Sequence, residues 1–190
     1  MRTLVVTEFV SLDGVMEAPG GEPGYPHAGW VGPFFGADLG AYKEEEQLAA
    51  DVLLLGRKTY DSFYGAWPHR EGAMADKINT IRKFVASTTL GSSGWQNTTV
   101  VASDLEEAVR ELKQEDGGPI LVPGSRSVVH TLLAAGLVDE IHLQEFPLVL
   151  GSGMRFFPET TAPIRVEHVA SQATQNGVLV QTYRVSTIRA

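Results

Sequence analysis

Residues 53–63 read LLLGRKTYDSF, and this stretch decides how the rest of the chain is interpreted. The apolar run DVLLLG, residues 51–56, is typical of a strand covered on both faces of a sheet. The run ends on Gly56, and then come two cations and a hydroxyl, Arg57, Lys58 and Thr59. Such a strand end indicates an open α/β sheet, in which ligands bind outside the carboxyl ends of the strands.

Hydrophobic patterns on either side of this stretch predict the remaining elements. Further strands are predicted at residues 3–10, 83–87, 98–103, 119–125 and 138–151, and helices at 38–50, 104–115 and 126–136. Asn176-Gly177 separates two alternating segments and is a strong β-hairpin signal. The predicted fold class is therefore α/β, with a mostly parallel central sheet, helices on both faces and a C-terminal antiparallel hairpin.

Composition narrows the class of protein. The chain has 190 residues, 43% of them hydrophobic, which suits a single domain spanning residues 1–190. Its formal net charge of −8 argues against nucleic-acid binding and against docking on anionic lipid, because both need a basic face. It has no cysteine, which excludes disulfides, Cys-ligated zinc and thiol catalysis. Neither a signal peptide nor a membrane span is predicted, so we expect a cytoplasmic protein.

Two other predicted strand ends carry chemistry like that of residues 56–59. One is followed by Ser87 and Thr88, and another by Gly124 and Ser125 at the start of a helix. A helix N-terminus favours phosphate, and glycine lets an oxygen approach the backbone closely. Each stretch alone could be an ordinary helix start or N-cap. Together, in this order, they predict loops that converge on a phosphorylated cofactor.

These stretches resemble the dihydrofolate reductase fold. The resemblance extends over nearly the whole chain, and it rests on GADLGAYK, LLLGRKTYDSF, KFVAS, ILVPGSRSVVHTLL and LVDEIHLQEFPLVLGSGMRFFP. SLDGV and GLVDEIHL are similar to one branch in particular, the reductase domain of riboflavin biosynthesis (the RibD C-terminal domain) and its stand-alone relatives. The resemblance implies a three-layer α/β fold and NADPH as the hydride donor.

The resemblance also implies which residues hold the cofactor. The pyrophosphate, the ribose and the 2′-phosphate would be contacted by Gly56, Arg57, Lys58, Thr59, Ser87, Thr88, Val122, Pro123, Gly124, Ser125 and Arg126. The nicotinamide would be flanked by Phe9, Val10, Asp13 and Gly14, although core packing is the alternative for Phe9 and Val10. Arg57 and Lys58 favour NADPH over NADH, because a doubly ionised 2′-phosphate needs positive charge.

The chain departs from the family pattern at two places. Pro123 stands where a glycine is frequent, and proline removes one amide donor. The segment YGAWPHR, residues 64–70, lacks the acidic pair that precedes the sugar-phosphate contact in riboflavin-pathway reductases. The substrate is therefore left open between a pyrimidine ribosyl phosphate and a pteridine. Without cysteines for a zinc deaminase domain, we expect no deaminase activity.

Reduction of a C=N or C=O bond also needs a proton donor. The candidates are Asp38, then Glu46, which shares an arc of its helix with apolar residues, and Asp13. Each has a simpler interpretation, namely a helix cap for Asp38, an exposed side chain for Glu46 and a turn residue for Asp13.

Aromatic side chains in or beside the loops either stack on a planar substrate or form a small core of their own. We take Trp30, Tyr60 and Trp67 as the substrate contacts. The histidines lack metal-ligand spacing, so no metal is predicted. The sequence thus predicts an NADPH-dependent reductase of a small planar heterocycle, a homodimer through its sheet edge. The alternative is a non-catalytic nucleotide-binding module on the same fold.

Overall fold

Eight strands form the sheet of this protein, whose structure is a computed structural model describing residues 1–160 and 163–186. Their order is β4-β3-β2-β5-β1-β6-β8-β7. The chain divides into two compact units, the first made of Met1–Val6 and Lys43–Val138, the second of Thr7–Tyr42 and the described residues from Asp139 onward. Strand β1 (Leu4–Ser11) and helix α1 (Ala37–Ala49) each contribute residues to both units.

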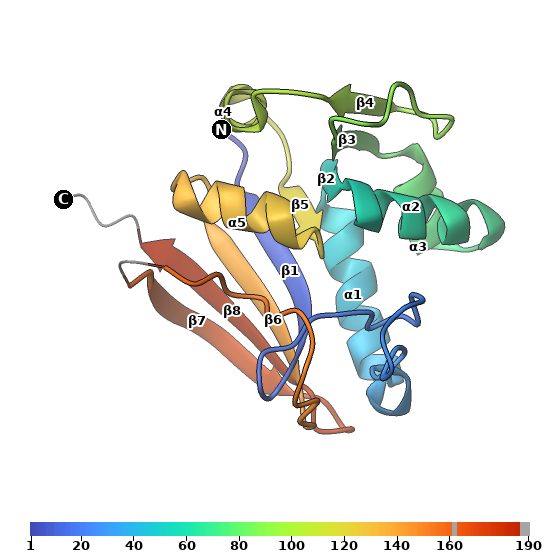
Figure 1. Cartoon of the computed structure of the whole chain (residues 1–190), viewed down its shortest axis with the longest axis vertical. Coiled ribbons are helices and arrows are strands. Elements are labelled where there is room, and N and C mark those ends of the chain that lie inside the picture. Colours follow the sequence, from blue (N-terminus) through green and yellow to red (C-terminus); the bar gives the residue numbers. More distant parts are fainter. Residues whose placement is uncertain (161–162, 187–190) are drawn as a thin grey trace. The chain divides into compact units, whose positions relative to one another are not determined.

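The first unit contains the parallel strands. They are β2 (Val52–Gly56), β3 (Arg82–Ala86), β4 (Thr98–Val101) and β5 (Ile120–Pro123). Strand β2 pairs in parallel with β3 on one side and β5 on the other, and β3 pairs in parallel with β4 (Figure 1). Every residue of β2 is buried, as the leucine run predicts. The mostly parallel sheet predicted from the sequence is confirmed.

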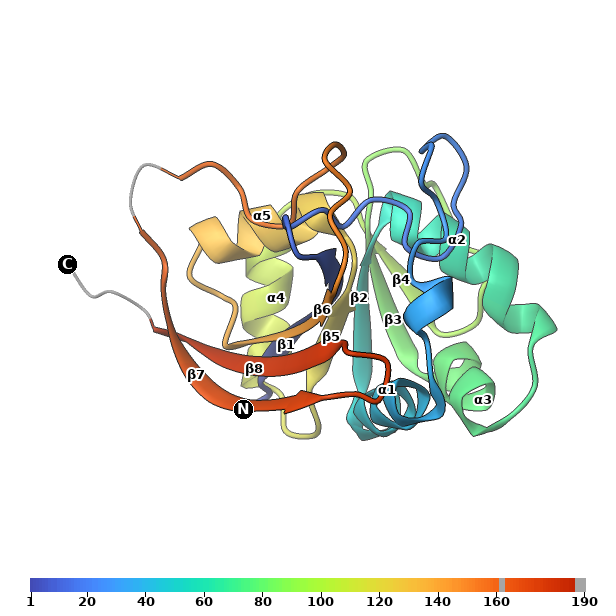
Figure 2. The ribbon, with the colours of Figure 1, turned by 90° about the horizontal axis from the view of Figure 1, so that it is seen from below.

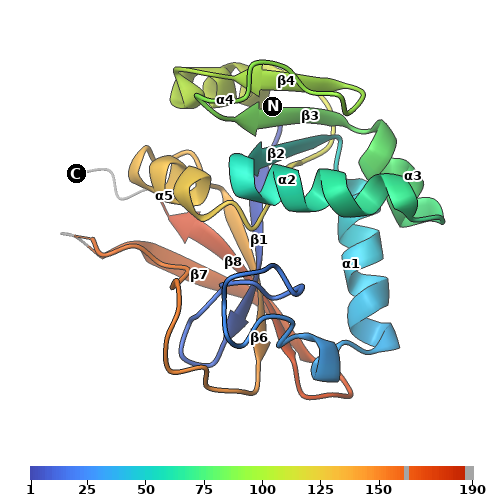
Figure 3. The same cartoon turned by 45° about the vertical axis from the view of Figure 1, so that its right-hand side comes forward.

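Helices α2 (Arg57–Ala66) and α3 (Ala73–Thr80) connect β2 to β3, and α4 (Leu105–Gln114) connects β4 to β5. Helix α5 (Arg126–Ala134) follows β5. The sequence prediction of no helix between residues 56 and 83 is wrong, since α2 and α3 lie there, with α2 beside β2 and β3 (Figure 3). Parallel strands need a crossover, and these helices supply it. Gly65, Pro68 and Gly72 cut the apolar pattern into pieces too short to be read as helices.

The core of the first unit forms on the side of β2 occupied by Leu53 and Leu55. These alternate residues pack with Val5, Val85 and Leu121 from neighbouring strands. Aromatic and aliphatic residues from the connecting segments close the cluster, namely Tyr60, Ile78, Ile81 and Trp95. The sheet and helices are therefore joined by a continuous apolar layer.

One cation is fully buried beside this core. The Lys83 ammonium donates hydrogen bonds to the carbonyl oxygens of Ile78, Asn79 and Ile81 at 3.0, 2.9 and 2.8 Å. It also lies 4.5 Å from the centre of the Trp95 ring. Burial lowers the pKa of Lys83 from 10.5 to about 8. Lys83 thus closes the C-terminal end of α3, where carbonyl groups lack helical partners.

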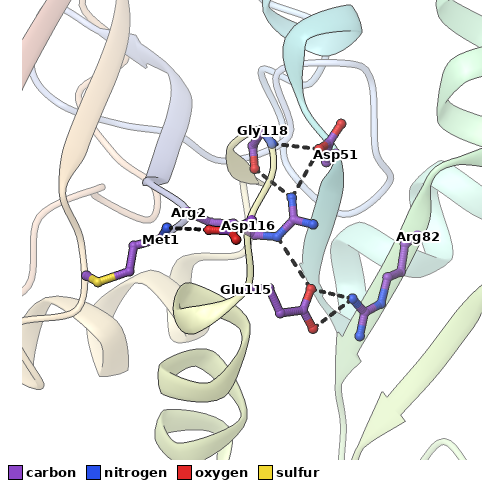
Figure 4. Close-up of polar contacts among 7 residues, drawn as sticks. All are labelled: Met1, Arg2, Asp51, Arg82, Glu115, Asp116 and Gly118. Carbon is purple, nitrogen blue, oxygen red and sulfur yellow. Dashed lines mark hydrogen bonds and ion pairs between the residues drawn. The ribbon is translucent and has the colours of Figure 1, made fainter.

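Charged residues join the amino-terminal ends of the strands in the same unit (Figure 4). The Arg2 guanidinium donates to Asp51 at 3.1 Å and to the carbonyl of Gly118 at 2.8 Å, and its Nε lies 3.4 Å from Glu115. Glu115 also pairs with Arg82 at 2.7 Å. The pKa of the Asp51 carboxyl is lowered, mainly by the hydrogen bond from the Gly118 amide. The network therefore links the starts of β1, β2, β3 and β5.

The second unit holds the antiparallel strands β6 (Glu140–Phe146), β7 (Arg165–Ala173) and β8 (Leu179–Ser186). Strand β8 pairs antiparallel with β6 and with β7 (Figure 2). The predicted hairpin is confirmed, and Gly177 at its turn has a φ of 80°. Strand β6 ends before Pro147, earlier than predicted, because proline has no N–H for the sheet. Edge strand β7 is exposed along its length, and the homodimer through this edge stays a prediction.

The long segment of residues 17–36 is held by an aromatic cluster of the second unit. Trp30 and Phe34 pack edge-to-face on Phe146, with ring centres 5.2 and 6.0 Å apart. The Tyr25 hydroxyl donates to the Ser152 carbonyl at 2.7 Å. Of the two interpretations of these aromatics, the structure favours a small core of their own.

Candidate cofactor site

The carboxyl ends of β2, β3 and β5 lie at one edge of the sheet. The parallel register pairs Gly56 at the end of β2 with Ala86 at the end of β3. Strand β5 pairs in parallel with the other side of β2. Residues Ser87, Thr88 and Gly124 follow these strand ends directly. The predicted convergence of these loops is therefore confirmed within the first unit.

Hydrogen bonds join the end of β2 to the end of β5. The Gly56 amide donates to the Ser125 hydroxyl at 2.9 Å, and this hydroxyl donates to the Pro123 carbonyl at 2.8 Å. The Ser125 amide donates to the Thr59 hydroxyl at 3.0 Å. These polar groups bond to one another, so they hold two strand ends in register. Their predicted contact with a phosphate stays a prediction, and the geometry supports a positioning role for Gly56, Thr59 and Ser125.

The turn after β5 has left-handed backbone at two successive residues. Gly124 has a φ of 55° and Ser125 a φ of 57°. A Cβ at Gly124 would lie 3.1 Å from the Thr59 hydroxyl, so glycine fits both the conformation and the space. Ser125 is strained there, since non-glycine residues avoid this region. Ser125, the N-cap residue of the helix α5 that follows, makes no side-chain capping hydrogen bond, and the free amides of a helix start are groups that anions bind.

An open pocket of about 420 Å³ lies at the same edge. It is lined by Arg57, Ala86, Ser87, Thr88, Val101, Ala102, Ser103, Asp104 and Leu105. Three of the lining residues, Arg57, Ser87 and Thr88, belong to the predicted cofactor site. Lys58 is exposed on α2 and is not part of this lining. The sequence did not predict Ser103 and Asp104, because they follow β4, whose end carries no glycine or cation.

Arg57 is held in place at the pocket by its neighbours. Its Nε donates to both carboxylate oxygens of Asp61 at 2.9 Å, and a terminal nitrogen lies 3.4 Å from the Thr89 hydroxyl. Its side chain stays 39% exposed. The Ser87 hydroxyl accepts from the amides of Thr89 and Leu90, at 3.3 and 3.1 Å, which shapes the loop after β3. The Arg57 guanidinium and the hydroxyls of Ser87, Thr88 and Ser103 all line the pocket, and this donor set suits a phosphorylated sugar.

The other residues of the predicted cofactor site have different surroundings. Val122 is buried in β5, and Arg126 is the first residue of α5. In the second unit, Phe9 packs edge-to-face on Phe146 with ring centres 5.4 Å apart, and Val10 is buried. Core packing is thus the favoured interpretation of Phe9 and Val10. Gly14 has a φ of 79° in the turn after β1, and its contact with the nicotinamide stays a prediction.

Two of the three candidate acids are anchored by hydrogen bonds in the second unit. Asp13 accepts from the Ser11 hydroxyl at 2.7 Å and from the Leu150 and Gly151 amides at 3.0 and 2.9 Å. The Ser11 bond is the largest cause that lowers the Asp13 pKa to about 2. The Gln175 amide, at 2.7 Å, is the main cause that lowers the pKa of Asp38. Both carboxylates are ionised at neutral pH, which favours structural roles for them.

Glu46, the third candidate, lies in the first unit on α1. Its side chain is 6% exposed and accepts a hydrogen bond from the Lys43 ammonium. The interpretation of Glu46 as an exposed helix residue is therefore wrong, since the apolar arc that it shares is covered. Its role as proton donor stays a prediction.

The predicted substrate contacts are largely enclosed by protein. Trp30 is buried, and its Nε1 donates to the Glu17 carbonyl at 2.8 Å. Tyr60 is buried, with its hydroxyl 2.7 Å from that of Ser93. Trp67 is half-buried, and the Arg70 guanidinium lies 4.5 Å from its ring centre. Burial favours packing roles for Trp30 and Tyr60, and the substrate contact of all three stays a prediction.

Sequence reasoning passed over a buried carboxylate, Glu8 of β1. The signal was available, since Glu8 lies two residues from both Val6 and Val10 and so points to the same face of the strand as these apolar residues. Within residues 1–160 and 163–186, no group of three or more His, Asp or Glu side chains is arranged to hold a metal ion. In the same residues, no helix is long and apolar enough to cross a membrane.

Known proteins resemble this chain in sequence and in fold. Uncharacterized protein YyaP of Bacillus subtilis is 29% identical over 187 residues, which is 96% of this chain and 94% of YyaP. Two solved structures share the fold. A deaminase and 5-amino-6-(5-phosphoribosylamino)uracil reductase of Thermotoga maritima matches with a TM-score of 0.67 and 15% identity, over 97% of this chain and 57% of that one. A dihydrofolate reductase of Enterococcus faecalis, complexed with NADP(H), matches with a TM-score of 0.60 and 18% identity, over 96% and 94%.

At these identities the two solved structures show the fold alone. A family model, described as RibD C-terminal domain, matches residues 2–180, which is nearly the whole chain. The chain therefore belongs to the RibD C-terminal domain family.

Proposed function

We propose that this protein is an NADPH-dependent reductase of a small planar heterocycle. Its family is one of reductases, which implies oxidoreductase activity. The observation that supports NADPH as the cofactor is the pocket at the carboxyl edge of β2 and β3, which is lined by Arg57, Ser87 and Thr88. The match to a dihydrofolate reductase complexed with NADP(H) supports the same proposal. The substrate we propose is a pyrimidine ribosyl phosphate or a pteridine such as dihydrofolate.

The residues of the first unit would hold the adenosine end of the cofactor. The Arg57 guanidinium pairs with a 2′-phosphate, and the hydroxyls of Ser87, Thr88 and Ser103 donate to the phosphate and sugar oxygens. The uncapped start of α5 offers amides to the pyrophosphate, while Ser125 keeps α5 and the end of β2 together. When bound, NADPH supplies a hydride.

The test of the cofactor is a titration with NADPH, followed by nicotinamide fluorescence, on the wild type and Arg57→Ala. We expect Arg57→Ala to weaken NADPH binding about 10- to 100-fold, because a charge-assisted pair with phosphate is lost. Arg110→Ala is the matched control, since Arg110 pairs only with Glu106 and Glu107 of its own helix among the described contacts. Equal NADPH affinity in the wild type and Arg57→Ala would show that the cofactor lies elsewhere.

Catalysis is tested separately, by following NADPH oxidation with dihydrofolate and with pyrimidine ribosyl phosphates. Turnover with one class identifies the substrate. NADPH binding without turnover on either class favours the second function, a non-catalytic nucleotide-binding module. The buried aromatic residues support that alternative, because Trp30 and Tyr60 present little surface to a substrate.

A further inference from the structure

The candidate cofactor pocket has an acidic residue in its lining, Asp104. Asp104 is exposed and precedes α4, in the N-cap position where aspartate ordinarily accepts a hydrogen bond from the helix. Here it makes no such bond, since its backbone is left-handed, with a φ of 51°. Across the described residues, the Asp104 carboxylate forms neither a hydrogen bond nor an ion pair with the protein. The carboxylate is thus available to a ligand in the pocket.

The charge balance of this pocket differs from that of a dedicated phosphate site. Its cationic lining residue is Arg57, whose guanidinium is already bound to Asp61 through two hydrogen bonds of 2.9 Å. Asp104 adds a carboxylate to the lining of the same pocket. A dianionic 2′-phosphate is repelled by Asp104, whereas a ribose hydroxyl can donate a hydrogen bond to it. Asp61 and Asp104 therefore counteract the preference for a 2′-phosphate that the Arg57 charge provides.

We propose that Asp104 is a specificity-determining residue that weakens the preference for the 2′-phosphorylated cofactor over NADH. This inference rests on the proposed function, because it assumes that the adenosine ribose enters this pocket. Removal of the Asp104 charge would strengthen NADPH binding about three- to tenfold, the range expected for one charge near a phosphate at the protein surface. Because Asp104 is exposed in an open pocket, salt would screen its repulsion of the 2′-phosphate. Salt would therefore reduce the difference in NADPH affinity between the wild type and the variant.

The experiment compares Asp104→Asn with the wild type. Asparagine tolerates left-handed backbone as well as aspartate does, so the loop before α4 is retained. Dissociation constants are measured by calorimetric titration for NADPH, NADH, adenosine 2′,5′-bisphosphate and adenosine 5′-monophosphate, at low and at high salt. We expect tighter binding of the two ligands with a 2′-phosphate, no gain for the other two, and a smaller difference at high salt.

Glu111→Gln is the matched control, because it removes one charge at an exposed residue of α4, the helix that Asp104 precedes, and lies outside the pocket. Equal changes in NADPH and NADH affinity, or an effect of Glu111→Gln as large as that of Asp104→Asn, would overturn the specificity role. In either case NADPH still binds, so the proposed function survives. Failure of both dinucleotides to bind the wild type overturns the proposed function and the specificity role together.

Discussion

At the scale of one residue, Ser125 was predicted to contact the cofactor, and in the structure its side chain links the ends of β2 and β5 by hydrogen bonds. Its hydroxyl accepts the buried Gly56 amide and donates to the Pro123 carbonyl. Its left-handed φ of 57° costs energy that these bonds offset. The position therefore stabilises the edge that carries the pocket, whatever it contacts in a complex.

We expect Ser125→Ala to lower the free energy of unfolding by about 1–3 kcal/mol, because the buried Gly56 amide loses its acceptor. Ser127→Ala, an exposed change two residues later, should leave stability nearly unchanged. Urea denaturation of the two variants measures the difference. Equal stability would mean that the Gly56–Ser125 hydrogen bond contributes nothing net.

At the scale of elements, the connections between strands depend on polar groups within a buried layer. Helix α3 is short and has only Ala75 and Ile78 buried, so packing alone holds it weakly. The Lys83 ammonium satisfies carbonyl groups at its C-terminal end and lies under Trp95. The hydrogen bonds of Lys83 therefore hold the end of α3, while the desolvation of its charge costs stability.

This cost predicts a pH dependence. Burial lowers the pKa of folded Lys83 to about 8 from 10.5, so between these values the unfolded chain binds more protons than the folded protein. The free energy of unfolding from this group therefore rises with pH across that window, by at most about 3 kcal/mol. Urea denaturation at both ends of the window, with Lys83→Met as the reference that lacks the group, measures the rise. An identical pH dependence in both proteins would contradict the prediction.

The whole molecule carries a net charge of −8, and some of its cations join elements that are distant in the sequence. Arg2 is an example in the first unit, with a side chain only 10% exposed that contacts Asp51, Glu115 and the Gly118 carbonyl. These partners precede β2 or lie between α4 and β5. One cation therefore links segments that are distant in the sequence.

We expect Arg2→Met to lower the free energy of unfolding by about 1 kcal/mol, because two half-exposed carboxylates and the Gly118 carbonyl lose a charged donor. Asp51 and Glu115 have lowered pKa values in the folded protein, so they stabilise it above their ordinary pKa and less as pH falls through the lowered one. Arg2→Met should reduce this acid sensitivity. Arg110→Met, at an exposed helical pair, is the control. The measurement is urea denaturation of both variants and the wild type at neutral and at acidic pH. If Arg2→Met were as stable as the wild type at both pH values, the Arg2 network would not contribute to stability.

Much of the fold could be predicted because its signals are local. These signals are the leucine run of β2, the Asn176-Gly177 turn and the apolar stripe of α4. Each of them is contained in a short stretch of sequence. Helices α2 and α3 were missed where Gly65, Pro68 and Gly72 interrupt the pattern. In the candidate site, the sequence predicted Arg57, Ser87 and Thr88 but not Ser103 and Asp104, which reach the pocket only through the pairing of β3 with β4.

The fold class, the family and the chemistry present at the strand ends could be inferred from the order of the residues alone, because they depend on residue type and short-range pattern. Which polar groups bond to one another, and which are left for a ligand, became visible in the folded protein. Gly56 and Ser125 are 69 residues apart in the sequence. The parallel pairing of β2 with β5 places the Gly56 amide nitrogen 2.9 Å from the Ser125 hydroxyl oxygen. Burial and hydrogen-bond pairing at such separations follow from the packed sheet, which no local pattern contains.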